Sequence, residues 1–322
     1  MRGAHRGIYV EHDTMIFSPE NDHVIVNYHY IEDPQPWARG IYPCSVAEFE
    51  RQIAFLAKHY TFVSVPQLYE AAQKDSQKKL CAITFDDGLR DQWENALPVL
   101  TAHGAAATFF VITGTWEGKI PSAHKIHMIS SRISPAELVE KFNAFVSNAF
   151  SDVAASYRIP LDRYLNSKRR HDDVAPANLK EMLNNIVPRE ISDAFLSRML
   201  DELDIAEPDA CKELFMNADE IRALRDQGFF VESHTHNHYS LDKETDEILH
   251  EDFRASADAL HRVLGHAPSV MAYPYGRPPV NHAMLADHGI AYGVTVESRC
   301  VARDDNPLLI PRFDTNDVRG VS

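Results

Sequence analysis

The sequence lacks the features that mark several broad classes of protein. Its cysteines are only four, Cys44, Cys81, Cys211 and Cys300, and no two form a Cys-x-x-Cys pair. We therefore expect reduced, mostly buried thiols rather than a disulfide framework. No apolar run approaches the roughly 18 residues of a membrane-spanning helix, and the N-terminus has no apolar run of signal-peptide length. These absences predict a cytoplasmic protein without a membrane span.

Positive charge is also scarce. Lysine and arginine total 32 against 47 aspartates and glutamates, which gives a formal net charge of −15. Binding to nucleic acid is therefore not expected, because phosphate contacts require clustered basic residues. The hydrophobic fraction of 44% predicts a packed core. The length fits one large α/β domain or two ordinary ones.

Short apolar runs alternate with amphipathic segments along most of the chain. We expect strands at residues 24–29, 61–65, 80–85, 105–112, 229–233, 269–274, 291–296 and 308–313. Helical patterns separate most of them, and the helix after Ser45 begins with a capping-box sequence. This alternation predicts a mostly parallel sheet. About eight strands favour an α/β fold of the distorted (β/α)7-8 barrel type, with an open doubly wound sheet as the alternative.

The alternation stops between residues 113 and 211, where no strand pattern occurs. Residues 177–187 and 190–203 have helical periodicity instead. The chain therefore divides into a barrel, residues 1–114 and 212–322, and a helical insertion, residues 115–211. The insertion could cap the barrel or form the contact of a homo-oligomer, and the sequence does not separate these roles.

Polar residues capable of chemistry follow the ends of the predicted strands. They are His29, Asp86, Asp87, His234, His236, His238, Tyr275, Arg312 and Asp314. In a parallel barrel the carboxyl ends of all strands face one mouth, where active sites are built. We therefore expect these residues, which are far apart in the sequence, to converge at that mouth.

The Asp-Asp-Gly turn and the sequence Ser-His-Thr-His-Asn-His contain the residue types of a metal centre. Adjacent carboxylates repel each other, and a bound cation would offset the repulsion. Imidazole and carboxylate suit Zn²⁺ with three protein ligands and an open position for water. Continued strand geometry would pair His234 with His236, whereas a bend after Thr235 would pair His234 with His238. We expect most of the other histidines to be surface residues. His124 and His127 lie early in the insertion and could reach the mouth of the barrel, but a surface position is favoured for them too.

The motifs Thr-Phe-Asp-Asp-Gly, Ser-His-Thr-His-Asn-His and Tyr-Pro-Tyr-Gly, in this order, resemble those of metal-dependent polysaccharide deacetylases of the NodB type, carbohydrate esterase family 4. The resemblance covers residues 20–114 and 212–314 and omits the insertion. It implies a distorted (β/α) barrel that hydrolyses N- or O-acetyl groups of sugars. It also implies one divalent metal, with Zn²⁺ as the favoured ion, and an acetylated sugar as the partner.

The resemblance also implies roles for individual residues. Carried over motif by motif, Asp86 is the general base and Asp87 a metal ligand. The family pattern His-[Ser/Thr]-x-x-His matches His234 and His238 as the other two ligands, and it leaves His236 at the rim.

The chain departs from the family pattern at two points. Ala272 stands where an arginine usually steadies the catalytic aspartate, and we hypothesise that Arg312 replaces it. The usual C-terminal Leu-x-His motif has no clear match, but Val-Asn-Tyr-His-Tyr-Ile resembles the Tyr-His element of the permuted subgroup and implies His29 as general acid. The Pro-Tyr-Gly element is retained and implies the backbone N–H of Tyr275 as oxyanion donor.

Together these features predict a metal-dependent hydrolase that removes an N-acetyl or other N-acyl group from a sugar. Because no export signal is found, we expect an intracellular nucleotide-linked or lipid-linked precursor of a bacterial surface polysaccharide. One alternative is an amidohydrolase-like enzyme of small amides with its metal on His234 and His236, which the Asp-Asp-Gly motif disfavours. The other is a carbohydrate-binding relative without activity, which the presence of Asp86 and His29 disfavours.

Overall fold

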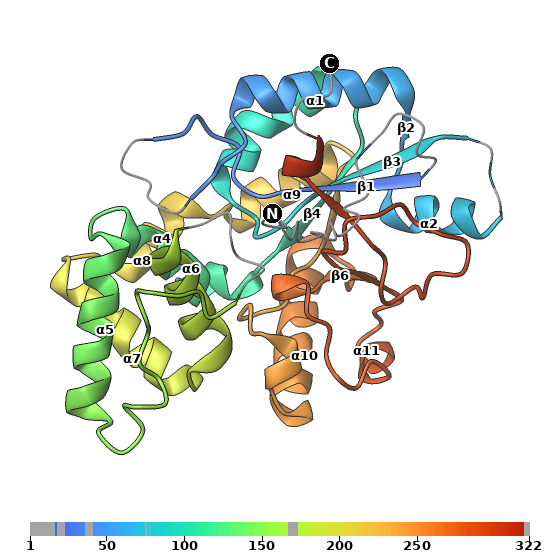
Figure 1. The fold of residues 1–322 in the computed structure, drawn as a ribbon. Helices are drawn as coiled ribbons and strands as arrows, with labels where there is room; N and C mark the ends of the chain where they lie inside the picture. The colour runs from blue at the N-terminus through green and yellow to red at the C-terminus, as the bar shows by residue number, and fades with distance from the viewer. Residues whose placement is uncertain are drawn as a thin grey trace, which may run out of the picture.

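The strands assemble into one curled parallel sheet (Figure 1). The computed structural model describes residues 17, 23–35, 41–74, 76, 78–166 and 173–318. The predicted barrel residues 1–16, 18–22, 36–40, 75, 77 and 319–322 and the predicted insertion residues 167–172 lie outside this part. Its strands are β1 His23–Tyr28, β2 Thr61–Phe62, β3 Leu80–Phe85, β4 Ala107–Val111, β5 Phe230–Ser233, β6 Val270–Ala272, β7 Tyr292–Val294 and β8 Phe313–Asp314. Their order is β7-β6-β5-β4-β3-β1-β8, with β2 paired to β3.

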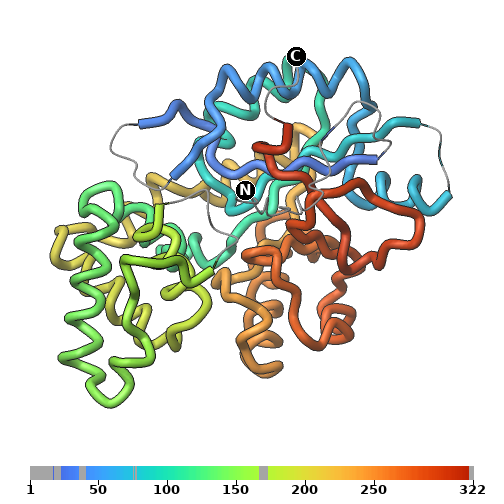
Figure 2. The backbone as a smooth tube through the Cα atoms, in the orientation of Figure 1, coloured from blue at the N-terminus to red at the C-terminus, as the bar shows by residue number. Residues whose placement is uncertain are grey.

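The segment that leads into β8 connects the two ends of this strand order. Ile310 forms a parallel bridge with Val294 of β7, and Phe313 pairs with Val26 of β1. In Figure 2 the red C-terminal segment accordingly lies beside the blue strand β1. The predicted distorted (β/α) barrel is therefore confirmed, and the open doubly wound sheet is not formed.

Several predicted strands are shorter than expected, and for two of them the reason is local. Residues 61–65 were predicted as one strand, but Val65 begins a helix because Ser64 and Gln67 form a reciprocal capping box. In the predicted strand 308–313, Pro311 has no N–H to donate to a ladder, and only the last residue lies in β8.

Helices surround the sheet and also form a separate group. Those beside the barrel strands are α1 Val46–His59, α2 Val65–Gln73, α3 Leu97–Ala102, α9 Ala218–Asp226, α10 Asp246–Leu264 and α11 Met284–Asp287. Between β4 and β5 come α4 Ser122–Ser130, α5 Pro135–Ala149, α6 Val174–Glu181, α7 Arg189–Glu202 and α8 Glu207–Leu214. Figure 1 shows α4–α8 gathered at one side of the sheet. Among the described residues no helix is both long and apolar enough to cross a membrane.

Short helices complete the chain and bear several of the residues discussed below. The π-helices are η1 Gln92–Ala96 and η3 Met182–Ile186; the 3₁₀ helices are η2 Thr113–Glu117, η4 Leu241–Lys243, η5 Pro274–Gly276 and η6 Thr315–Val318.

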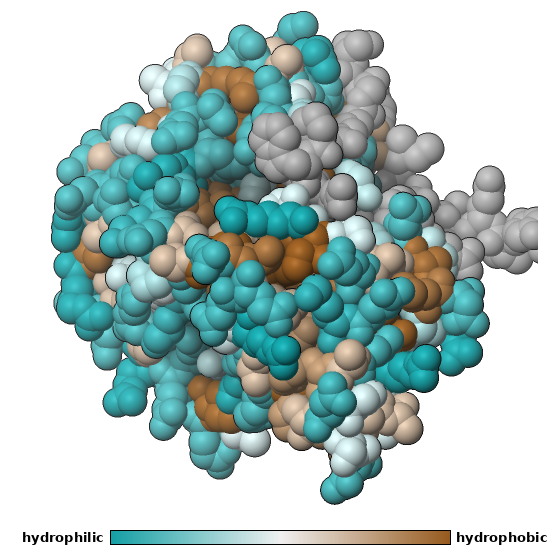
Figure 3. Space-filling view, turned by 90° about the vertical axis from the view of Figure 1, so that its left-hand side faces the viewer, coloured by the Kyte–Doolittle hydropathy of each residue, from teal (hydrophilic) through white to brown (hydrophobic). Residues whose placement is uncertain are grey.

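The helices between β4 and β5 have a hydrophobic cluster of their own. Leu138, Phe142, Phe195 and Met199 are among its buried members, and the rings of Phe142 and Phe195 meet edge to face at 5.1 Å. The division at residues 115 and 211 stays a prediction, because this packing does not define where the insertion begins and ends. The face on that side is mainly hydrophilic, with hydrophobic areas interrupted by polar side chains (Figure 3).

Candidate active site

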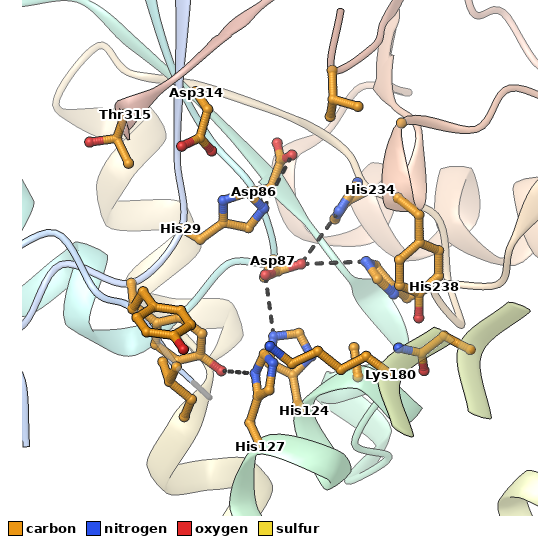
Figure 4. Close-up of a pocket in the computed structure, with 18 of the residues that line it drawn as sticks. His29, Asp86, Asp87, His124, His127, Lys180, His234, His238, Asp314 and Thr315 are labelled. Atoms are coloured by element: carbon orange, nitrogen blue, oxygen red, sulfur yellow. Dashed lines mark hydrogen bonds and ion pairs between the residues drawn. The ribbon is translucent and has the colours of Figure 1, made fainter. Parts of the chain in front are cut away.

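The carboxyl ends of the strands surround a cavity of about 310 Å³. Six of the seven residues predicted for the site line it: His29, Asp86, Asp87, His234, His238 and Tyr275. The seventh, Arg312, lies behind the cavity wall with only 1% of its surface exposed. The convergence expected from the strand ends is therefore observed for these six residues and for Asp314, which also lines the cavity, but not for His236 (Figure 4).

Asp87 lies at the centre of this group. Its Oδ1 is 3.4 Å from Nε2 of His234 and 3.5 Å from Nε2 of His238. All three side chains are buried, and they are the one group of potential metal-ligating residues found within the described part of the chain. The arrangement places two imidazoles and one carboxylate around a common point.

The backbone bends where the pairing of His234 with His238 requires it. Strand β5 ends at Ser233, and Thr235 and His238 have positive φ angles of 67° and 58°. The carboxylate of Asp252, on α10, accepts hydrogen bonds from the backbone N–H groups that follow Thr235. The bend turns His238 back toward His234.

His236 points away from this group. Its Nδ1 lies 3.0 Å from the hydroxyl of Thr113, and its Nε2 lies 3.7 Å from a carboxylate oxygen of Glu117. The pairing of His234 with His236 that a straight strand would produce is therefore not formed.

The two candidate ligand imidazoles differ in their surroundings. Nδ1 of His234 donates to the carbonyl of Ala272 at 2.8 Å, which directs Nε2 toward Asp87. Burial lowers the pKa of His238 to about 3, so this imidazole is neutral. Its Nδ1 is buried and has no hydrogen-bond partner. Burial alone would lower the pKa of His234, but the carboxylates of Asp86 and Asp87 outweigh it and raise this pKa.

Backbone strain is concentrated around the cavity. Five non-glycine residues among those described have positive φ, and four of them, Asp87, Thr235, His238 and Tyr275, belong to the site or its bend. Left-handed conformations cost free energy in residues with a Cβ and persist where the surrounding structure enforces them, often at functional sites. The strain therefore points to the same region as the side chains do.

Asp86 is fixed by an arginine from the far end of the sequence. The guanidinium of Arg312 donates to both carboxylate oxygens at 2.8 Å, and the amide of Asn27 donates to Oδ2 at 3.1 Å. Burial alone would raise the pKa of Asp86, but the charge of Arg312 outweighs it, and the pKa falls to about 2. The carboxylate is therefore ionised at neutral pH.

His29 stands between Asp86 and the open cavity. Its Nε2 is 3.9 Å from Oδ2 of Asp86, and 42% of its side chain is exposed. The π-helix η1 and the residue before it hold the chain around His29: Gln92 donates to the carbonyls of His29 and Asp86, and Asp91 accepts the N–H of Ile31. Sequence reasoning missed these anchors, because a π-helix changes which side chains share a face.

The expectation of a surface position was wrong for His124, on α4. It is only 2% exposed, lines the cavity, and has its Nε2 3.2 Å from Oδ2 of Asp87. His127 also lines the cavity, where its Nδ1 lies 3.1 Å from the hydroxyl of Tyr30. Local periodicity could not have placed them, because their position depends on how α4 packs onto the barrel.

A second cavity, of about 390 Å³, adjoins the first and shares Asn184, His238 and Tyr275 with it. Its walls come from η3 and α7 on one side and from the segment after His238 on the other. Its charged residues are two basic, Arg189 and Lys243, and two acidic, Glu190 and Glu244. The second cavity therefore has balanced charge.

Comparison with known families agrees with the motifs. The sequence profile of the family described as polysaccharide deacetylase matches residues 73–141 and 199–293, just over half of the chain. The matched residues include Asp86, Asp87, His234, His238 and Tyr275. The unmatched internal segment, 142–198, is shorter than the predicted insertion. No curated protein shows significant sequence similarity to the chain.

Several solved structures have a similar fold. The deacetylase PplD of Streptococcus pyogenes, in complex with acetate, has a TM-score of 0.57 at 18% identity, over 92% of this chain and 93% of PplD. IcaB from Ammonifex degensii has a TM-score of 0.55 at 17% identity, over 91% of each chain. A de-N-acetylase from Aggregatibacter actinomycetemcomitans has a TM-score of 0.52 at 15% identity, over 91% of this chain and 95% of its own. At these identities the likeness concerns the fold.

Proposed function

Because the chain belongs to the polysaccharide deacetylase family, and is therefore a carbohydrate deacetylase, we propose that it uses one divalent metal ion to hydrolyse an N-acetyl group of a sugar. Asp87, His234 and His238 would hold the ion, and Zn²⁺ is the favoured one. Ligand atoms about 2.1 Å from a tetrahedral zinc lie roughly 3.4 Å from one another. The 3.4 and 3.5 Å separations between Asp87 Oδ1 and the two imidazole nitrogens match that spacing, and this observation carries the proposal.

The remaining site residues have roles in moving protons. A bound divalent ion would supply a Lewis acid and lower the pKa of water toward neutrality. Asp86, ionised and fixed by Arg312, accepts a proton from the water that attacks the acyl carbon. His29 donates a proton to the sugar nitrogen as the C–N bond breaks, which leaves acetate and a free amine. Its position in the cavity beside Asp86 supports this role.

The backbone N–H of Tyr275 is the proposed donor to the oxyanion of the tetrahedral intermediate. Tyr275 lines the cavity beside the candidate ligands, and its ring lies 4.8 Å from that of His238. Its φ of 58° turns the Pro-Tyr-Gly backbone sharply at this point. We assign it this role from its place at the cavity and its retained motif.

The two adjoining cavities favour a substrate larger than one sugar ring. The acetylated sugar would occupy the cavity at Asp87, and the rest of the substrate would extend past Asn184 and Tyr275. The balanced charge of the second cavity suits a neutral sugar unit better than a diphosphate. The intracellular precursor, the cytoplasmic location and the homo-oligomer stay predictions.

The two alternatives are less well supported. An amidohydrolase-like centre needs His236 as a ligand, and this side chain contacts Thr113 instead. A carbohydrate-binding protein without activity was suggested by the missing arginine at Ala272. The bidentate contact between Arg312 and Asp86 supports Arg312 as the replacement for that arginine.

Matched alanine variants test the proposal. We expect Asp87→Ala and His238→Ala to lose both bound zinc, measured by elemental analysis, and acetate release from N-acetylated sugars. His236→Ala is the control and should keep one zinc per chain, because it is not a proposed ligand. Stoichiometric zinc in Asp87→Ala, or its loss in His236→Ala alone, would overturn the ligand assignment.

A further inference from the structure

Helix α4 carries a buried imidazole that the proposed mechanism does not use. His124 is 2% exposed, and neither of its ring nitrogens has a hydrogen bond of good geometry. Leaving a buried polar group without a partner costs about 1–3 kcal/mol, so such groups require an explanation. The nearest charged atom is Oδ2 of Asp87, 3.2 Å from Nε2 (Figure 4).

The two oxygens of Asp87 therefore face different partners. Oδ1 faces the imidazoles of His234 and His238, and Oδ2 faces His124. We propose that His124 is a positioning residue of the metal centre: its Nε2–H holds Oδ2 of Asp87 and so presents Oδ1 to the ion. A small rotation of the imidazole would complete the hydrogen bond, because the distance is already within range. This inference rests on the metal site of the proposed function.

The geometry distinguishes positioning from direct ligation. The potential ligand atoms of Asp87, His234 and His238 all lie within 4.8 Å of one another, and His124 is not part of that set. The rings of His124 and His238 are 6.1 Å apart, centroid to centroid. A contact from outside the ligand set, directed at the second oxygen of a ligating carboxylate, is how supporting residues orient metal ligands.

Helix α4 is itself braced so that it can hold His124 in place. On one side, Lys125 forms an ion pair with Glu207 of α8 at 2.8 Å. On the other, the hydroxyl of Ser122 donates to Asp193 of α7 at 3.3 Å. The ring of Phe215 packs edge to face against His124 at 5.0 Å. The helices between β4 and β5 thus contribute to the metal centre as well as to the wall of the cavity.

Zinc affinity of His124 variants tests this inference without measuring activity. His124→Phe keeps a ring but removes the N–H, and we expect zinc binding to weaken about 10- to 100-fold. His124→Gln places an amide N–H where Nε2 lies, and it should retain most of the affinity. His127→Phe is the control on the same helix and should bind zinc like the wild type, because His127 contacts Tyr30 and not Asp87. Competition with a chromophoric chelator gives the affinities.

Cobalt spectra separate the possible roles. We expect Co²⁺ bound to the His124→Gln protein to have the visible spectrum of the wild type, because the ligand set is unchanged. A changed spectrum would identify His124 as a ligand and overturn the inference, as would wild-type zinc affinity in His124→Phe. Circular dichroism establishes whether each variant is folded. If His124→Phe does not fold, the cobalt spectrum of His124→Gln still decides between the two roles. If the wild type itself binds no zinc, the proposed function fails and this inference fails with it, whereas zinc binding by the wild type together with wild-type affinity in His124→Phe overturns this inference alone.

Discussion

Replacing Arg312 by methionine should both destabilise the protein and change the pH dependence of its activity. The guanidinium and the Asp86 carboxylate are almost completely buried and joined by two hydrogen bonds of 2.8 Å. Removing one partner of a buried ion pair leaves an uncompensated charge and costs about 3–5 kcal/mol. The pKa of Asp86, about 2 compared with an unfolded value near 3.9, indicates that the folded surroundings as a whole favour the ionised carboxylate by roughly 2–3 kcal/mol.

The sign of the pH effect follows from these pKa values. In the wild type, the contribution of Asp86 to stability is fully present above the unfolded pKa near 3.9 and is lost as the pH falls toward 2. In Arg312→Met, burial is the main remaining influence, and it raises the pKa. The stability difference between the two proteins should therefore grow as the pH rises above 4. The acid limb of the pH profile of kcat/KM should move to higher pH by roughly two pH units or more.

Urea unfolding and acetate release, each measured as a function of pH, provide the assays. The double variant Arg312→Met/Asp86→Asn is the matched control: it leaves no buried charge unpaired, so it should recover much of the stability while remaining inactive. Arg312→Lys keeps the charge but not the bidentate contact. Its stability and its activity should therefore lie between those of the wild type and those of Arg312→Met. Wild-type kcat/KM and an unshifted acid limb in Arg312→Met would refute the argument.

Three further changes test other parts of the site. Asp252→Ala removes the acceptor of two backbone N–H groups in the His234–His238 bend. We expect the free energy of unfolding in urea to fall by about 1–3 kcal/mol and zinc binding to weaken. Unchanged zinc affinity would contradict a role of Asp252 in shaping the bend. Burial raises the pKa of Asp91 to about 8. In urea unfolding, the wild type should therefore lose stability relative to Asp91→Asn as the pH rises from 4 to 8. A stability difference between the two proteins that does not change with pH would show that this pKa is not raised. Gly114→Ala places a Cβ 2.5 Å from the carbonyl oxygen of His236. We expect the free energy of unfolding, measured with heat or urea, to fall by about 1–3 kcal/mol. Unchanged stability would mean that the backbone can move apart at this contact.

The barrel and the meeting of its polar residues could be predicted because both depend on local patterns. Apolar runs such as the one that forms β3 mark strands, and a parallel barrel brings their carboxyl ends to one mouth. The placement of Asp86 and Asp87 beside His234 follows from that geometry alone. Their roles in catalysis stay predictions until variants are measured.

The choice between the two histidine pairings depended on more than local pattern. Strand alternation favours His234 with His236, whereas the Asp-Asp-Gly partner and the spacing of a known motif favoured His238. In the bend at Thr235, the backbone N–H groups of His236 and Asn237 donate to Asp252, sixteen residues beyond His236 on α10. A contact of that kind is not visible in a hydrophobic pattern.

Residues brought in by packing between helices could not be predicted. His124 reaches Asp87 because α4 packs against the cavity at the strand ends, and its sequence neighbours do not indicate that placement. The contact of Arg312 with Asp86 was predictable only as a hypothesis from its strand-end position. In both cases the partner in space is distant in sequence.

Acetate release measured during stepwise loading of the metal-free protein with zinc tests the central claim most directly. The substrate would be an oligomer of N-acetylglucosamine, and the bound zinc would be determined in the same samples. We predict no release from the metal-free protein and a linear rise that saturates at one zinc per chain. Release by the metal-free protein, or none at one bound zinc across a panel of N-acetylated sugars, would contradict a metal-dependent sugar deacetylase.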